Sequence, residues 1–117
     1  MVRGRILLVE DERLISFLWE DICDLHNVDV VGIAETPAQA LEILESPKDI
    51  SGVILDVHLK GGTSELVAER IRELGLPVIV STGRDVESLP EAYQGFETIL
   101  KPYRPEEMVV ALNNMLS

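Results

Sequence analysis

Short apolar runs alternate with amphipathic stretches five times along the chain, and this alternation restricts the fold more than any other feature of the sequence. The runs are rich in Val, Ile and Leu, and the predicted strands are residues 5–9, 28–34, 52–55, 77–81 and 98–100. Strands that alternate with helices predict an α/β fold with a doubly wound parallel sheet and right-handed crossovers. The third run is apolar throughout, as expected of a central strand that is buried on both faces.

The first two helices carry clear signals. Residues 12–26 have an apolar stripe at helical spacing, made of Leu14, Ile15, Leu18, Trp19, Ile22 and Leu25. In the second helix, Thr36 supplies an N-cap and Pro37 occupies the first helical position, where proline is well tolerated. This helix is expected to end near residue 45.

The later helices are predicted from their ends. Thr63 or Ser64 can cap a third helix that ends before Gly75, a residue type common just after a helix. Residues 85–94 could form one short helix, but Pro90 interrupts them. Pro105 begins the last helix.

The 117 residues fit one domain, which we expect to span residues 1–117. Hydrophobic residues make up 46% of the chain and charged residues 26%, as in ordinary globular proteins. The apolar runs are too short to cross a bilayer and no signal peptide opens the chain, so no membrane partner is expected. The single Cys23 cannot form an internal disulfide, which fits a reducing compartment, and we expect a cytoplasmic protein.

The charge of the chain argues against nucleic acid as a partner. Its formal net charge is −11, whereas nucleic-acid binding normally needs a basic surface. Only 4% of residues are aromatic, so platforms for stacking single-stranded bases are also scarce. The acidity could equally serve solubility alone.

Charged and hydroxyl side chains follow the predicted strands where the carboxyl ends of the strands meet. Glu10 and Asp11 follow the first strand, Asp56 the third, Thr82 the fourth and Lys101 the fifth. In open α/β sheets this edge is where ligands bind. Two like charges about 5 Å apart repel by roughly 3 kcal/mol at an effective dielectric near 20, so three ionised carboxylates call for a cation. The alternative is a solvated acidic loop.

Oxygen ligands favour Mg²⁺, which is held by carboxylates together with waters and phosphate oxygens. Zinc is not expected, because Cys23 and His26 lie on a helix outside any His/Cys cluster. A carboxylate at Asp56 can act as a nucleophile toward a phosphoryl group, with Lys101 stabilising a phosphoryl oxygen and Thr82 donating to another. Taken singly, the lysine could be a surface residue and the threonine a strand-end cap.

Four motifs together resemble the CheY-like receiver domains of bacterial response regulators, over essentially the whole chain. They are residues 6–12 (ILLVEDE), 53–57 (VILDV), 80–83 (VSTG) and 100–103 (LKPY). Each motif is weak alone, but the four occur in the right order and spacing. The resemblance implies a flavodoxin-like (βα)5 fold with the strand order 2-1-3-4-5.

The resemblance also implies roles for the residues at the strand ends. Asp56 would be the phosphoacceptor, Glu10 and Asp11 the acidic pair that organises Mg²⁺, Thr82 the switch hydroxyl and Lys101 the lysine that contacts the phosphate. The backbone carbonyl of His58 would complete the metal site. The peptide bond between Lys101 and Pro102 would be cis, a form that is accessible before proline.

The chain departs from the usual receiver pattern at several positions. Thr98 stands where receivers commonly carry an aromatic residue that couples to the threonine, and Phe96 or Tyr93 could take over that role. Lys60 and Ser64 replace a common proline and glycine. Residues 77–83 partly resemble a subgroup of stand-alone receivers that is named for a Phe-Ala-Thr-Gly motif and lacks the aromatic residue.

We therefore expect a stand-alone receiver that takes a phosphoryl group from a histidine kinase or a histidine phosphotransfer protein. It would signal to an unknown downstream protein by contact or onward phosphotransfer. Ile15, Phe17 and Leu18 are candidates for docking the partner, with core packing as the alternative for Ile15 and Leu18. His58 and Arg84 would flank the path of an attacking water and tune the lifetime of the phosphate.

Two other classes compete with this interpretation. A phosphate-independent interaction module would keep the fold and signal by binding alone, which the missing aromatic residue favours and the intact strand-end residues oppose. A phosphatase with an aspartyl-phosphate intermediate would also need Asp56, Mg²⁺ and Lys101. Such enzymes usually place a second acid two residues after the nucleophile, where this chain has His58.

Overall fold

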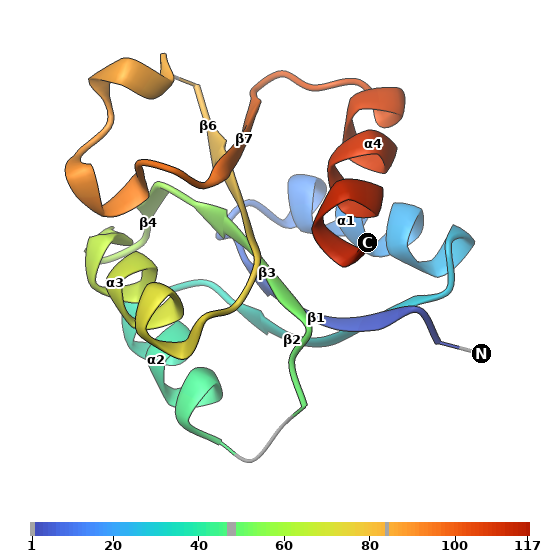
Figure 1. Ribbon diagram of the computed structural model, residues 1–117, viewed down its shortest axis with the longest axis horizontal. Helices are drawn as coiled ribbons and strands as arrows, with labels where there is room; N and C mark the ends of the chain where they lie inside the picture. Colours follow the sequence, from blue (N-terminus) through green and yellow to red (C-terminus); the bar gives the residue numbers. More distant parts are fainter. Residues whose placement is uncertain (1, 47–48, 84) are drawn as a thin grey trace.

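The computed structural model describes residues 2–46, 49–83 and 85–117. Its centre is a five-stranded parallel sheet in the order β2-β1-β3-β6-β7 (Figure 1). The strands are β1 (Gly4–Val9), β2 (Val28–Ala34), β3 (Gly52–Asp56), β6 (Val78–Thr82) and β7 (Glu97–Leu100). Counted along the chain, this is the predicted order 2-1-3-4-5, so the doubly wound fold is confirmed.

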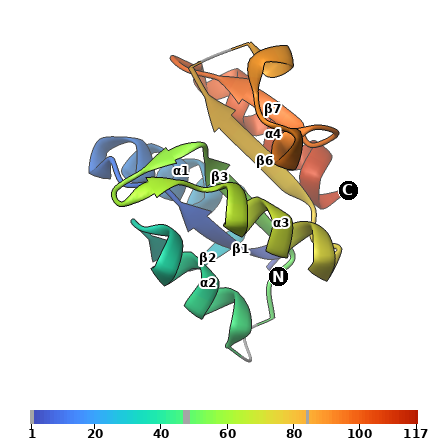
Figure 2. The ribbon, with the colours of Figure 1, turned by 90° about the vertical axis from the view of Figure 1, so that its left-hand side faces the viewer.

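Helices cover both faces of the sheet, as Figures 1 and 2 show. One face packs against α1 (Arg13–Leu25) and α4 (Pro105–Leu116), and the other against α2 (Pro37–Glu45) and α3 (Glu65–Leu74). We call them the α1/α4 face and the α2/α3 face. Successive strand side chains point to opposite faces, so Ile6 and Leu8 enter the α1/α4 core while Leu7 and Val9 enter the α2/α3 core.

Helix α1 buries a narrower stripe than its sequence predicts. Trp19 and Cys23 are fully buried, and Ile22 packs beside them. Leu14 and Leu25 belong to the predicted apolar stripe, but they are 74% and 69% exposed. A helix that lies on one sheet buries only the stripe that faces it, and these two leucines lie outside that stripe at the ends of the helix.

The predicted helix ends are confirmed except for one side chain. Thr36 accepts a hydrogen bond from the Gln39 amide at 3.1 Å, and Gly75 ends α3 with a left-handed φ of 70°. Ser64 is the residue before α3, but its hydroxyl does not cap the helix. The hydroxyl donates instead to the backbone carbonyl of Asp56 at the end of β3.

Two short features were not predicted. A hairpin of β4 (His58–Leu59) and β5 (Gly62–Thr63) follows β3. Residues 85–96, which we call segment 85–96, contain two single 3-10 turns, Val86–Ser88 and Glu91–Tyr93, in place of a short helix. Pro90 lies between the turns, where it lacks the amide proton that a continuous helix would need. No helix within the described residues is long and apolar enough to cross a membrane.

Candidate phosphorylation and metal site

Three carboxylates meet at the carboxyl ends of β1 and β3. Glu10 follows β1, and Asp56 is the last residue of the neighbouring strand β3, with Val9 and Leu55 paired just before them. Glu10 is 2% exposed and Asp56 is 5% exposed. Each of these residues and Asp11 offers a carboxylate oxygen within 4.8 Å of the other two. Parallel strands end at one edge of the sheet, which explains why Glu10 and Asp56, 46 positions apart in the chain, lie together.

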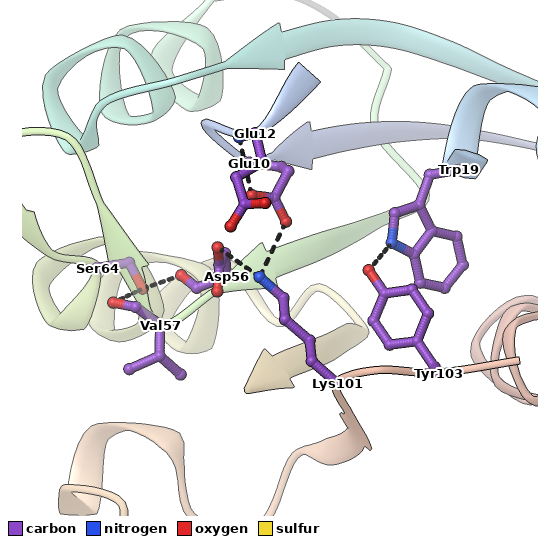
Figure 3. Close-up of polar contacts among 8 residues, drawn as sticks. All are labelled: Glu10, Glu12, Trp19, Asp56, Val57, Ser64, Lys101 and Tyr103. Atoms are coloured by element: carbon purple, nitrogen blue, oxygen red, sulfur yellow. Dashed lines mark hydrogen bonds and ion pairs between the residues drawn. The ribbon is translucent and has the colours of Figure 1, made fainter. Parts of the chain in front are cut away.

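Lys101 supplies a positive charge to this cluster (Figure 3). Its Nζ lies 3.0 Å from Asp56 Oδ2 and 3.4 Å from Glu10 Oε1. The backbone holds the lysine in place, because its amide donates to the carbonyl of Thr82 at 2.8 Å. The peptide bond between Lys101 and Pro102 is cis. The predicted convergence of the lysine with the two acids and the predicted cis bond are both confirmed by this geometry.

The cluster is electrostatically unbalanced. Burial raises the pKa of Glu10 to about 7, with the charge of Asp56 acting in the same direction and the Glu12 amide opposing it. Burial acts against the charge of Lys101, but its hydrogen bonds to Asp56 and Glu10 raise its pKa overall. Three carboxylates thus face one ammonium, and burial, helped by the charge of Asp56, is what raises the pKa of Glu10 toward neutrality.

The donor set fits a hard divalent cation. All three side chains offer oxygen, which suits Mg²⁺ far better than zinc. An ion of charge +2 would balance the charge that one lysine leaves uncompensated. Cys23 is fully buried in the α1/α4 core and burial raises the pKa of its thiol to about 12, so it offers no thiolate.

Thr82 and His58 lie near the cluster in different ways. Thr82 ends β6 and is 2% exposed, one residue after Ser81, which pairs with Asp56 across the strands. His58 begins the β4–β5 hairpin two residues after Asp56, and it is exposed. Arg84, the second residue expected to tune the lifetime of the phosphate, lies outside the described residues.

The candidate docking residues differ in exposure. Phe17 is 65% exposed and Leu18 is 43% exposed, whereas Ile15 is partly buried against the α1/α4 core. Core packing is therefore confirmed for Ile15 and wrong for Leu18, which lies outside the α1/α4 core. Beside Lys101 lies a shallow cavity of about 380 Å³, lined by Glu12, Ile15, Leu18, Lys101, Pro102 and Tyr103.

Two hydrogen bonds near the site, one partly buried and one buried, were missed by sequence reasoning. Trp19 Nε1 donates to the hydroxyl of Tyr103 at 2.8 Å, and the hydroxyls of Ser64 and Tyr93 lie 3.0 Å apart (the first pair is drawn in Figure 3). The partners are 84 and 29 residues apart in the chain. The sequence offered two signals for the second pair. Ser64 stands where receivers commonly have glycine, and Tyr93 was a candidate to replace the aromatic residue that is absent at Thr98.

The fold and the site define a class of protein. The chain belongs to the response regulator receiver domain family, whose family model matches residues 6–113. Members of this family are regulatory domains of two-component signalling systems rather than classical enzymes, and the interpretation of the four sequence motifs is confirmed.

Several individual proteins are similar to this chain in sequence and in structure. The solution structure of SdrG from Sphingomonas melonis is 33% identical, covers 100% of both chains and superposes with a TM-score of 0.83. The response regulator PhyR from Brucella abortus is 29% identical over 97% of this chain and 47% of its own, with a TM-score of 0.81. The aerobic respiration control protein ArcA of Escherichia coli K12 is 34% identical over 100% of this chain and 50% of its own length. The chain spans about half the length of the curated relatives it matches.

Proposed function

We propose that this receiver domain is a Mg²⁺-dependent phosphorylation switch that accepts a phosphoryl group on Asp56. The observation that carries the proposal is the position of this carboxylate. It is held at the end of the central strand, 3.0 Å from a lysine and within 4.8 Å of two further acids. The phosphoryl donor is a phosphohistidine on a histidine kinase or on a histidine phosphotransfer protein.

The transfer needs one nucleophile and several fixed charges. An oxygen of Asp56 forms a bond to phosphorus as the bond from phosphorus to the histidine nitrogen breaks, and that nitrogen keeps the electron pair. We assign the attack to Oδ1, because Oδ2 accepts from Lys101. The lysine then follows the negative charge to a phosphoryl oxygen, and the Thr82 hydroxyl donates to another.

Glu10, Asp11, Asp56 and the backbone carbonyl of His58 would hold the metal ion. Bound Mg²⁺ neutralises charge on the attacking carboxylate and on the phosphoryl oxygens. Glu10 must lose its proton to act as a ligand, so its raised pKa makes metal affinity depend on pH near neutrality.

Labelling with a small phosphoryl donor tests the proposal. The protein is incubated with acetyl phosphate, with Mg²⁺ or with EDTA, and its intact mass is compared with that of Asp56→Asn. We expect the gain of one phosphoryl group, and this gain should need both Mg²⁺ and Asp56. If no labelling occurs, even with a panel of phosphorylated histidine kinases, the proposal fails and a phosphate-independent interaction module takes its place.

The kinase or phosphotransfer protein would dock beside the site, on the exposed N-terminal part of α1. Phe17 and Leu18 are exposed apolar side chains there, and Leu18 also lines the cavity beside Lys101. Phe17→Ala should slow transfer from the cognate phosphohistidine about tenfold, as expected when an exposed aromatic anchor is removed, and should leave acetyl phosphate labelling unchanged. Leu25→Ala at the other, equally exposed end of α1 is the control. Equal rates for the two variants would remove Phe17 from the interface.

His58 and Arg84 would set the lifetime of the aspartyl phosphate by orienting or blocking the attacking water. The exposed His58 is close enough in the chain to act on a group attached to Asp56. Dephosphorylation of the labelled protein, followed by intact mass, should change when both residues are replaced by alanine. An unchanged rate would exclude both residues.

A further inference from the structure

A chain of buried hydroxyl groups joins segment 85–96 to the backbone of Asp56. The Tyr93 hydroxyl lies 3.0 Å from Ser64 Oγ, which lies 2.5 Å from the carbonyl oxygen of Asp56 and 3.3 Å from that of Val57. Tyr93 and Ser64 are fully buried. Figure 3 shows the Ser64 side chain turned toward the end of β3, on the side of Asp56 away from Lys101.

The direction of these hydrogen bonds follows from their atoms. Ser64 has one hydroxyl proton, and the two carbonyl oxygens beside it can only accept. The serine therefore donates to the backbone, and Tyr93 must donate its own proton to Ser64 Oγ. Burial raises the pKa of Tyr93, so the phenol keeps the proton that this arrangement requires.

The rest of segment 85–96 is held by α3, the helix that begins directly after Ser64. From the last turn of α3, Arg72 donates to the carbonyls of Ala92 and Gln94 at 3.1 and 2.8 Å, and its guanidinium lies 4.3 Å from the centre of the Phe96 ring. Arg72 is exposed, so its contacts compete with water. Within the segment, the Gln94 side chain donates to the carbonyls of Val86 and Leu89 and joins the two single turns. Tyr93 adds the fully buried hydroxyl that reaches from the segment toward β3.

Thr82 connects the proposed phosphorylation site with the core that contains Tyr93. It lies two residues after Val80, so both side chains leave β6 on the α2/α3 face, where Val80 packs in the same core as Tyr93. A phosphoryl group on Asp56 that draws Thr82 inward would change the packing at the start of this core. Position 98 on β7 holds a threonine, so no aromatic ring there can respond to a movement of Thr82.

We infer that Tyr93, acting through Ser64, is the positioning residue that couples Asp56 to segment 85–96 in place of the missing aromatic residue at Thr98. The inference rests on the proposed phosphorylation of Asp56. Phosphorylation breaks the bond between Tyr93 and Ser64, and segment 85–96 is released to change conformation. The segment is then the part of the α2/α3 face that presents the signal to a partner.

Amide hydrogen exchange of segment 85–96, read by mass spectrometry before and after acetyl phosphate labelling, tests the coupling. In the wild-type protein, phosphorylation should raise exchange in this segment about fivefold, the factor that corresponds to one hydrogen bond. Tyr93→Phe removes the hydroxyl and keeps the ring. It should raise exchange about fivefold without phosphate, and phosphorylation should then add no further change. Ser64→Ala should behave in the same way, and provides the test if Tyr93→Phe fails to fold.

Tyr103→Phe is the matched control, because it removes the hydrogen-bonded, partly buried tyrosine hydroxyl of the opposite face. Its phosphorylation-dependent change in segment 85–96 should equal that of the wild type. If Tyr93→Phe and Ser64→Ala keep the full change as well, both hydroxyls have only a structural role and the inference is overturned. Intact mass measured on the same samples separates this result from a failure of the proposed function, in which no variant takes up a phosphoryl group.

Discussion

Each face of the sheet has one tyrosine whose hydroxyl is hydrogen-bonded inside the molecule, and the two tyrosines differ in their partners. On the α1/α4 face, Tyr103 accepts from the indole of Trp19, and the two rings lie 5.5 Å apart at an angle of 56°. Two regular helices of 13 and 12 residues enclose this contact. On the α2/α3 face, Tyr93 comes from a 3-10 turn and bonds to Ser64, whose hydroxyl reaches the backbone of the proposed phosphoacceptor.

This difference shows how one small sheet can combine stability with response. The α1/α4 face is closed by long helices around a large, fully buried aromatic side chain. The α2/α3 face carries segment 85–96, which is built from two single 3-10 turns and bonds to Ser64 beside the site through the Tyr93 hydroxyl. Regions with short turns and exposed backbone open at lower free energy than packed helices do. We therefore expect the first face to determine global unfolding and the second to determine the signal.

The largest expected effect is on stability and contrasts the two faces directly. Trp19→Ala should lower the free energy of unfolding by about 3–5 kcal/mol, because a large buried side chain is replaced by a cavity. Tyr93→Phe should cost only about 1 kcal/mol, the value of one hydrogen bond. Urea unfolding followed by circular dichroism measures both values. Leu14→Ala, at a 74% exposed position of α1, is the control for loss of apolar surface. Equal losses in the free energy of unfolding for Trp19→Ala and Tyr93→Phe would show that the two faces do not differ in this way.

The next effect concerns Glu10, which lies at the carboxyl edge of the sheet, between its two faces. The pKa of Glu10 in the folded protein is about 7, against an ordinary value of 4.5, so the folded state binds the proton more tightly than the unfolded state does. The free energy of unfolding of the metal-free protein should therefore fall as pH rises from 4.5 to 7, by about 1.4 kcal/mol per pH unit from this group. Glu10→Gln should remove this contribution, and Mg²⁺ should restore stability to the wild type at pH 8. A curve that Glu10→Gln leaves unchanged would show that the carboxylate does not titrate in this range.

The smallest effect is confined to the response. Thr82→Ala should leave acetyl phosphate labelling at Asp56 in place. It should reduce the phosphorylation-dependent change in hydrogen exchange of segment 85–96 about fivefold, because one hydrogen bond to the phosphoryl group is lost. Thr98→Ala, on the neighbouring strand, is the matched control and should keep the full change. Binding of a downstream partner should follow the same pattern. Equal partner binding by phosphorylated wild type and Thr82→Ala would exclude the threonine from the switch.

The parts of the molecule that follow periodic patterns could be predicted from the sequence. Five apolar runs and the helices between them determine the sheet, and the rule that parallel strands end at one edge brings Glu10, Asp56 and Lys101 together. The two-residue strands of the β4–β5 hairpin are too short to show a period, and their turn depends on Gly61 and Gly62 at φ values of 89° and 133°.

Contacts between distant side chains could not be predicted in this way. Ser64 has the residue type and position of a helix cap, and nothing local indicates that its hydroxyl turns back to β3. The partner of Tyr93 likewise depends on how α3 packs against segment 85–96. Such pairs are decided by tertiary packing, which propensities and spacing do not encode.

The contact between Trp19 and Tyr103 has a practical consequence. Trp19 is the one tryptophan of the chain, so the long-wavelength fluorescence of the whole protein comes from this single indole. Its hydrogen-bond partner lies two residues after Lys101, whose ammonium holds both Asp56 and Glu10. We expect a ligand that draws the lysine away from these acids to shift the loop that carries the indole's partner. The single indole should then act as an optical reporter, with emission that changes when a cation binds or when Asp56 is phosphorylated.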